Sequence, residues 1–345
     1  MPGHVLVLPT AIHPDAVALL EAAPGVTVET LDPARAGEAA LREALARTDA
    51  ALLRVVPFGA RELAMAPRLR VVARHGVGYD LVDVAALTAR GVPLTITPDA
   101  NAASVAEHAL MLLLAVARRV TAYDARVRAL RWGTDPALPT FDLAGRAALV
   151  VGYGRIGARV ARLLDALGMR VAVHDPGVPA GTVRGAGHVP APDLHAALGE
   201  ADAVTLHLPA SAGTRGMVDA RFLGAMRRGA VLINTARGAL VDEGALAGAL
   251  RSGQVAVAGL DVLAEEPAVA SSPLLGLPNV VLTPHSAATT AEGMRRMGMD
   301  AARCVLDVLE GRGPDPECVV NPEALGAVPA VAPAPAARAP ALSAP

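Results

Sequence analysis

Short apolar runs alternate with longer amphipathic stretches along almost the whole chain. The apolar runs consist mainly of Val, Leu and Ala, which is typical of strands in parallel sheets covered on both faces. The stretches between them repeat with the period of a helix. This alternation predicts an α/β protein. Strands are expected at 4–8, 26–30, 50–53, 70–73, 93–96, 147–151, 171–174, 203–208, 230–234, 256–260 and 280–283, and helices at 15–21, 38–47, 156–167 and 288–310.

One segment interrupts the alternation. Residues 102–131 predict a single long apolar helix that begins near Asn101 or Ser104 and ends before Trp132. Strand–helix alternation then restarts at Ala147, which indicates a second α/β domain. Residues 178–192 are rich in Gly and Pro and are expected to form a loop, and the Ala/Pro tail at 326–345 is expected to be disordered.

Composition excludes several classes of function. Hydrophobic residues make up 53% of the 345 residues, which is ample for two buried cores. The net charge of −2 is spread without a basic stripe, and there are only one Trp, three Tyr and three Phe, so neither nucleic acid nor a membrane is an expected partner. All 31 cationic residues are Arg, which excludes a catalytic lysine or a Schiff base.

The cysteines and the N-terminus bear on the compartment. Cys304 and Cys318 do not have a metal-ligand spacing, and no metal site is expected. The N-terminal residues lack the basic and long apolar regions of a secretion signal, and the longest purely apolar stretch, 109–117, is too short to span a bilayer as a helix. A cytoplasmic protein is the expectation.

A glycine-rich loop joins the strand at 147–151 to the next helix. Its sequence is Gly152-Tyr-Gly154-Arg-Ile-Gly157, a G-x-G-x-x-G pattern. The first glycine permits a tight turn, the second lets a pyrophosphate approach the backbone, and the third allows close packing of helix on strand. Free amides at the start of the helix then face the phosphate charge. This context predicts a dinucleotide site.

An acidic residue ends the second strand of this unit. Asp175 lies eighteen residues after Gly157 and can accept hydrogen bonds from the adenosine ribose. Its charge would also repel a 2′-phosphate, so NAD is favoured over NADP. The alternative is a turn or capping aspartate before Pro176.

Three polar segments follow or end predicted strands further along the chain. They are Asn-Thr-Ala-Arg-Gly at 234–238, Gly-Leu-Asp-Val at 259–262 running on to Glu-Glu-Pro at 265–267, and Thr-Pro-His-Ser at 283–286. Carboxyl ends of parallel strands are where α/β sheets gather their ligands. Taken singly, each Arg, Glu or His has an ordinary structural explanation, so the argument depends on their order.

In that order, with the glycine loop, these motifs resemble the D-isomer-specific 2-hydroxyacid dehydrogenase family from about residue 4 to Asn321-Pro322. The resemblance implies two Rossmann-like domains. One is a flavodoxin-like substrate domain made of 1–100 plus 287–322, and the other is an inserted doubly wound NAD-binding domain at 101–286. It also implies NAD as cofactor, and the family typically pairs through its nucleotide domains, so a homodimer is expected.

The resemblance implies a catalytic triad of Arg237, Glu266 and His285. The chemistry is reasonable on its own terms. A guanidinium offers a planar fork to the carboxylate and carbonyl of a 2-oxo acid, and an imidazole exchanges a proton with the C2 oxygen near neutral pH. A carboxylate on the other ring nitrogen would fix the tautomer and favour the charged ring. Glu265 is the competing position for Glu266.

Further contacts are implied by the same resemblance. Asp261 is expected to bond the nicotinamide carboxamide, with a strand-end cap as the alternative, and Asn101 is expected near the reacting group, with a helix N-cap as the alternative. Val77 and Gly78 are expected to offer backbone amides to the substrate carboxylate, or else to form a plain turn. The remaining expected cofactor contacts are Val105, Arg155, Ile156, His207, Pro209, Thr214, Thr235 and Ala236.

Two arginines bear on the substrate. Arg54 and Arg74 end neighbouring predicted strands, and two guanidinium groups would suit a second anionic group such as a phosphate or sulfonate. The phosphoglycerate dehydrogenases have a similar Arg, although the apolar residues 55–58 depart from their pattern. The substrates left open are 3-phosphoglycerate, hydroxypyruvate or glyoxylate, and 3-sulfolactate. An NAD-sensing binding protein like the C-terminal-binding-protein co-repressors is the alternative to an enzyme.

Overall fold

The computed structural model of the chain describes residues 3–9 and 11–326. It contains two compact units, one from Met1–Ile96 with Ala301–Pro345 and one from Thr97–Asp300. The sequence placed the second crossing near residue 287, whereas the long helix α12 (Ala291–Leu309) begins in one unit and ends in the other. The expected disordered tail lies, apart from Gly326, outside the described residues.

The first unit has a five-stranded parallel sheet. Its order is β2-β1-β3-β4-β5, the flavodoxin-like order. The strands are β1 (Gly3–Leu8), β2 (Val26–Thr30), β3 (Ala50–Leu53), β4 (Val71–Arg74) and β5 (Leu94–Thr95), and the helices are α1 (Pro14–Glu21), α2 (Pro33–Arg47), α3 (Ala60–Met65) and α4 (Val84–Ala89). Leu6, Leu52 and Phe58 are among the fully buried side chains of its core.

The C-terminal segment closes the exposed side of β5. After α12 and the short turn Pro316–Cys318, Val319 forms an antiparallel bridge with Thr95. The buried side chain of Asn321 accepts a hydrogen bond from the Leu94 amide at 2.7 Å and donates one to the Val92 carbonyl at 3.0 Å. These bonds satisfy edge groups that would otherwise lack partners.

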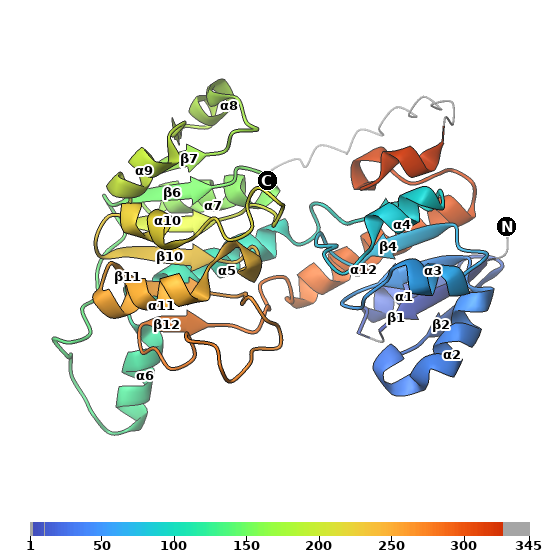
Figure 1. Cartoon of the computed structure of the whole chain (residues 1–345), viewed down its shortest axis with the longest axis horizontal. Coiled ribbons are helices and arrows are strands. Elements are labelled where there is room, and N and C mark those ends of the chain that lie inside the picture. Colours follow the sequence, from blue (N-terminus) through green and yellow to red (C-terminus); the bar gives the residue numbers. More distant parts are fainter. Residues whose placement is uncertain (1–2, 10, 327–345) are drawn as a thin grey trace, which may run out of the picture. The chain divides into compact units, whose positions relative to one another are not determined.

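The second unit has a seven-stranded parallel sheet in the order β12-β11-β10-β9-β6-β7-β8 (Figure 1). Its strands are β6 (Ala147–Val151), β7 (Arg170–His174), β8 (Val189–Pro190), β9 (Ala203–Leu206), β10 (Ala230–Asn234), β11 (Val255–Leu260) and β12 (Val280–Leu282). Its other helices are α5 (Ala102–Ala117), α6 (Val120–Arg128), α7 (Arg155–Ala166), α8 (Ala180–Gly185), α9 (Leu194–Glu200), α10 (Ala220–Ala225) and α11 (Glu243–Ser252). Strands β7 and β8 are added on one side of β6, and strands β9 to β12 are added on the other side. Doubly wound folds bind ligands at the point where the strand order changes sides, here between β6 and β9.

Two expectations about secondary structure are wrong. The expected helix over 102–131 is two helices, because Arg119 has a left-handed backbone with φ 52°. The Ala117 carbonyl accepts a hydrogen bond from the Phe141 amide at 3.1 Å instead of from the next helical turn. The expected loop over 178–192 contains α8 and the short edge strand β8. Just after β8, the Ala191 amide donates a hydrogen bond to the Val173 carbonyl of β7 and continues the same register. A two-residue edge strand tolerates Pro190 because its outer side needs no donor.

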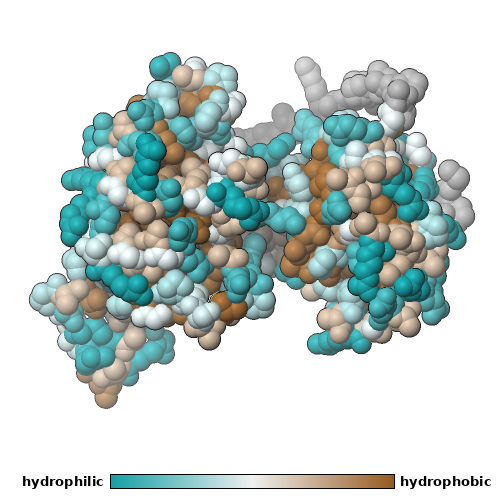
Figure 2. Space-filling model, in the orientation of Figure 1, coloured by the Kyte–Doolittle hydropathy of each residue, from teal (hydrophilic) through white to brown (hydrophobic). Residues whose placement is uncertain are grey.

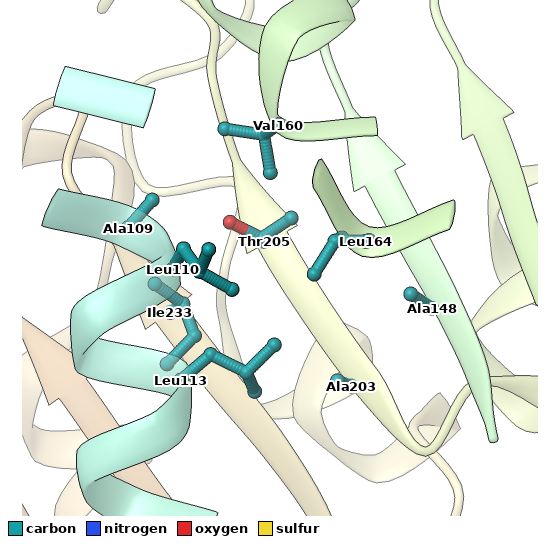
Figure 3. A pocket seen from close by; sticks show the side chains of 9 residues that line it. All are labelled: Ala109, Leu110, Leu113, Ala148, Val160, Leu164, Ala203, Thr205 and Ile233. Atoms are coloured by element: carbon teal, nitrogen blue, oxygen red, sulfur yellow. The ribbon is translucent and has the colours of Figure 1, made fainter. Parts of the chain in front are cut away.

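Helices cover both faces of the second sheet. A small apolar cavity of about 10 Å³ lies between α5, α7 and the sheet (Figure 3). This volume is at the lower limit for one water, and only Thr205 among its lining residues is polar. The cavity is therefore a packing defect of the core and is too small for a cofactor.

Candidate functional site

The glycine loop has the geometry that a dinucleotide requires. Gly152 has φ +92°, and a Cβ there would lie 2.5 Å from the His207 carbonyl oxygen, while a Cβ on Gly157 would overlap the Gly152 carbonyl. A Cβ on Gly154 would meet nothing within 4 Å, so its side of the loop is open. Two of the glycines are thus imposed by packing, and the third leaves space where the backbone meets the first turn of α7.

Unpaired polar atoms mark several of the expected contact residues. Among the described residues, the buried side-chain atoms that lack a hydrogen-bond partner include Thr235 Oγ1, His207 Nδ1 and Asn101 Oδ1. Asn101 stands at the N-cap position of α5, yet its side chain makes no capping bond. Buried polar groups are normally paired, so these three atoms fit an interaction with a bound group. Burial also lowers the pKa of His207 to about 3, which keeps its ring neutral.

The carboxylate of Asp175 is anchored to the loop itself. One oxygen accepts a bond from the Tyr153 amide at 2.7 Å and the other from the Gly177 amide at 2.8 Å. The second of these bonds is the turn role considered as the alternative. A carboxylate has about four acceptor positions, so two remain for ribose hydroxyls.

The other expected cofactor residues surround the same end of the sheet. Thr214 donates to the Pro209 carbonyl at 2.6 Å and accepts from the Ser211 amide, which closes the loop after β9. Arg155 forms a 3.3 Å ion pair with Asp99 at the first turn of α7. Ile156 follows it on α7 and is half-buried, Val105 on α5 is buried, and Ala236 is half-buried beyond β10.

Arg237 follows β10 in a turn held by Asn234. The buried Asn234 side chain accepts from the Ala236 amide and donates to the Arg237 carbonyl, both at 2.9 Å. A Cβ on the next residue, Gly238, would overlap the carbonyl of Leu263. The missing side chain therefore allows the Arg237 turn to contact the segment that carries Glu266.

Glu266 and His285 form a direct pair. His285 Nδ1 lies 2.6 Å from Glu266 Oε2, and the other carboxylate oxygen accepts from the Leu263 amide at 3.1 Å. Burial would raise the pKa of Glu266, but the hydrogen bond and charge of His285 outweigh it and lower the pKa. The pair identifies Glu266, and not Glu265, as the partner of the imidazole, and it leaves Nε2 for another partner.

His285 occupies a strained turn beyond β12. Its φ of 51° is left-handed, a conformation that costs a non-glycine residue roughly 1–3 kcal/mol. Its amide donates to the backbone carbonyl of Asp261 at 2.8 Å, and the Asp261 carboxylate accepts from the amides of Ser286 and Ala287, both at 2.9 Å. Asp261 thus holds the His285 turn in place through hydrogen bonds to both its backbone carbonyl and its carboxylate.

The Asp261 carboxylate is completely buried within the second unit. Burial would raise its pKa, but the hydrogen bonds from His108, Thr283 and the two backbone amides outweigh this and lower it. These bonds are the strand-end cap that the sequence offered as the alternative role. The contact with a nicotinamide carboxamide rests on the resemblance alone and stays a prediction.

Sequence reasoning missed His108 as a member of this network, and it gave Thr283, quoted within the Thr-Pro-His-Ser segment, no role of its own. His108 on α5 has Nε2 2.9 Å from the hydroxyl of Thr283 and 3.3 Å from Asp261 Oδ1. The available signal was helical spacing, because Ser104, His108 and Leu112 recur every four residues on one face of α5.

Four of the expected substrate residues, Arg54, Arg74, Val77 and Gly78, belong to the first unit. Arg54 directly follows β3 and Arg74 ends β4, and the register pairs Leu53 with Arg74. Both arginines therefore stand at the carboxyl ends of neighbouring strands of that sheet. Arg74 donates to the His75 carbonyl at 2.9 Å. Val77 and Gly78 follow in a half-buried turn.

Comparison with known proteins agrees with this architecture. Residues 110–287 match the family model described as D-isomer specific 2-hydroxyacid dehydrogenase, NAD binding domain. A D-3-phosphoglycerate dehydrogenase of Mycobacterium leprae is 44% identical over 272 residues, which are 79% of this chain and 51% of the relative. This chain therefore spans about half the length of the phosphoglycerate dehydrogenases that it matches.

Other relatives are matched over most of their length. A glyoxylate reductase of Korarchaeum cryptofilum is 40% identical over 77% of this chain and 80% of its own. The structure of an NADPH-dependent glyoxylate/hydroxypyruvate reductase from Sinorhizobium meliloti, in complex with citrate, superposes with a TM-score of 0.82 and 32% identity, over 93% of this chain and 99% of the other. This chain belongs to the D-isomer specific 2-hydroxyacid dehydrogenases, a family of oxidoreductases, and contains their NAD-binding domain.

Proposed function

We propose that this protein interconverts a small D-2-hydroxy acid and the matching 2-oxo acid, with NAD(H) as the hydride carrier. The observation that carries the proposal is the 2.6 Å pair of His285 and Glu266 beside the Arg237 turn. These residues follow β10, β11 and β12, which are neighbours in one sheet. The three residues thus gather at the carboxyl ends of neighbouring strands, which supports a triad of one cation, one proton donor and one carboxylate.

Each side chain of the triad has a distinct task. Arg237 binds the carboxylate and carbonyl of the 2-oxo acid through its planar guanidinium. His285 gives a proton from Nε2 to the C2 oxygen during reduction and takes it back during oxidation, because Nδ1 is bonded to Glu266. Glu266 fixes the ring orientation and stabilises the protonated ring.

The second unit supplies the cofactor site. The amides at the start of α7 would hold the pyrophosphate, Asp175 the adenosine ribose, and the unpaired hydroxyl of Thr235 and ring nitrogen of His207 are further polar contacts. When bound, the nicotinamide supplies or accepts the hydride. The charge of Asp175 favours NAD over NADP because it would repel a 2′-phosphate.

The first unit bears on the choice of substrate. Arg54 and Arg74 stand at the carboxyl ends of neighbouring strands, and together they suit a second anionic group. This arrangement favours 3-phosphoglycerate over hydroxypyruvate or glyoxylate, with 3-sulfolactate as the third candidate. The co-repressor-like alternative gains no support from the relatives named above, which are a dehydrogenase and two reductases.

A panel assay tests the proposal. NADH oxidation is followed with phosphohydroxypyruvate, hydroxypyruvate, glyoxylate and phenylpyruvate, for the wild type and for His285→Ala. Turnover of at least one 2-oxo acid that is lost in the variant supports the function. Absence of turnover with every member, in protein that binds NADH, contradicts it.

We also propose a homodimer through the second unit. Helix α6 projects from that unit in Figure 1, and hydrophobic residues lie at the tip of this projection in Figure 2. Leu130 and Trp132, just beyond α6, are 93% and 88% exposed. Exposed apolar side chains of this size are typical of an interface between copies. Sedimentation at the mass of one 34.9 kDa chain at micromolar concentration would contradict it.

No helix in the described part of the chain is both long and apolar enough to cross a membrane.

A further inference from the structure

We infer that His108 is a positioning residue for the catalytic turn, acting on Asp261 through Thr283 and through its own 3.3 Å contact with Oδ1. The inference concerns three side chains from three elements, namely α5, the end of β12 and the end of β11. None of them needs to touch the substrate for this role. The kinetic part of the inference rests on the proposed function, and the structural part does not.

The hydrogen-bond directions follow from what each group can donate. The hydroxyl of Thr283 donates its one proton to Asp261 Oδ1 at 2.5 Å. A hydroxyl with its proton committed can only accept, so the 2.9 Å contact with His108 Nε2 requires the proton to be on that nitrogen. His108 therefore carries a proton on Nε2, and the chain of donors runs from His108 through Thr283 to Asp261.

Close packing places His108 at the start of this relay. Gly259 on β11 lies under α5, and a Cβ there would be 3.1 Å from the Leu112 Cβ and 3.0 Å from the Ile233 Cδ1. His108 is one helical turn before Leu112 and therefore lies on the same face of α5. The side chain is 15% exposed, so water competes little for its donor.

The relay matters because of what Asp261 holds. Its carboxylate accepts the amides of Ser286 and Ala287, and its carbonyl accepts the amide of His285. A buried carboxylate with fewer donors rotates or takes up a proton, and either change weakens its bonds to those amides. His285 would then leave the strained backbone conformation that aims its ring at Glu266.

The kinetic test compares variants matched for shape. His108→Leu removes the donor and keeps the volume, whereas His108→Gln retains an N–H donor of similar reach. We expect kcat about tenfold lower in His108→Leu, the factor for losing one hydrogen bond of about 1.4 kcal/mol, with KM for the 2-oxo acid nearly unchanged. His108→Gln should retain most of the activity. The exposed neighbour Glu107→Gln is the control and should match the wild type.

The second arm needs no activity. Hydrogen exchange of the peptide containing Ser286 and Ala287 should be about tenfold faster in His108→Leu and in Thr283→Val, and unchanged in Glu107→Gln. The loss in the double variant should be less than the sum of the two single losses, because both changes weaken the same set of bonds to Asp261. Inactive wild-type protein would refute the proposed function while this arm still tests the relay.

Three outcomes would overturn the inference. One is a His108→Leu protein with normal exchange at the catalytic turn. Another is equal damage in His108→Leu and His108→Gln, which would show that the imidazole acts by packing. The third is additive loss in the double variant, which would show that His108 and Thr283 act independently.

Discussion

The bond between Glu266 and His285 gives the sharpest test of the mechanism. Glu266→Gln keeps the shape of the side chain but removes its charge. Hydrogen bonds to charged groups contribute about 1.5–3 kcal/mol. The ring is 50% exposed and the carboxylate 37% exposed, so solvent screening reduces the expected loss to about 1 kcal/mol. Since 1.36 kcal/mol corresponds to a factor of ten, kcat for reduction should fall about fivefold at pH 7.

The assay is the pH dependence of kcat for reduction of the best 2-oxo acid. The carboxylate acts on the ring only while it is ionised, so this fivefold difference between wild type and Glu266→Gln should be present at pH 7 and shrink as the pH falls through the lowered pKa of Glu266. NADH affinity is the control and should be unchanged. A Glu266→Gln enzyme with the wild-type kcat at pH 7 would refute the proposed role, because it would mean that Glu266 does not support proton transfer by His285.

The same variant has a stability signature. The pKa of Glu266 is lowered from its ordinary value of 4.5, so the carboxylate stabilises the fold above that pH and stops doing so as the pH falls through the lowered value. The difference in unfolding free energy between wild type and Glu266→Gln should therefore be present at pH 7 and vanish in acid. A difference that persists in strong acid would point to packing.

Four further changes have distinct outcomes. His285→Ala should lower kcat by roughly 10²–10⁴ with NADH binding nearly unchanged, and a near-normal kcat would remove the imidazole from the mechanism. Arg237→Lys should mainly raise KM for the 2-oxo acid, because an ammonium lacks the planar fork, and an unaltered KM would place the substrate carboxylate elsewhere. Asp175→Ser should narrow a preference for NADH over NADPH of about tenfold or more, measured as kcat/KM, and an unchanged ratio would mean that Asp175 serves only its backbone partners. Gly238→Ala should destabilise the protein by about 3 kcal/mol or more, because a Cβ there overlaps Leu263, and a melting temperature equal to the wild type would contradict the contact.

Most of the fold could be predicted from the sequence because buried parallel strands are local features. The strands at 50–53, 147–151 and 230–234 have the expected bounds. The break in the helix over 102–131 could not be predicted, since it depends on a bond from Phe141, a residue distant in sequence. Strand β8 was missed for the same reason, because a two-residue strand exists only through its pairing with β7.

For the candidate site, too, the sequence predicted some residues and missed another. Motif order was enough to choose Arg237, Glu266 and His285, and the structure adds the direct bond between the last two. His108 was missed because its spacing of four residues from Ser104 and Leu112 indicates a shared helix face but not the role of the histidine. That role depends on which strand the helix covers, and this depends in turn on Gly259.

The closure of β5 by Asn321 has a consequence for synthesis of the chain. The bond between Leu94 and Asn321 spans 227 residues, and the whole second unit lies between them. Leu94 leaves the ribosome long before Asn321 is synthesised. The outer edge of β5 therefore stays unpaired while residues 97–300 emerge and fold. We therefore expect the inserted unit to mature first, and nascent chains stalled before residue 318 to bind chaperones through the unfinished N-terminal sheet.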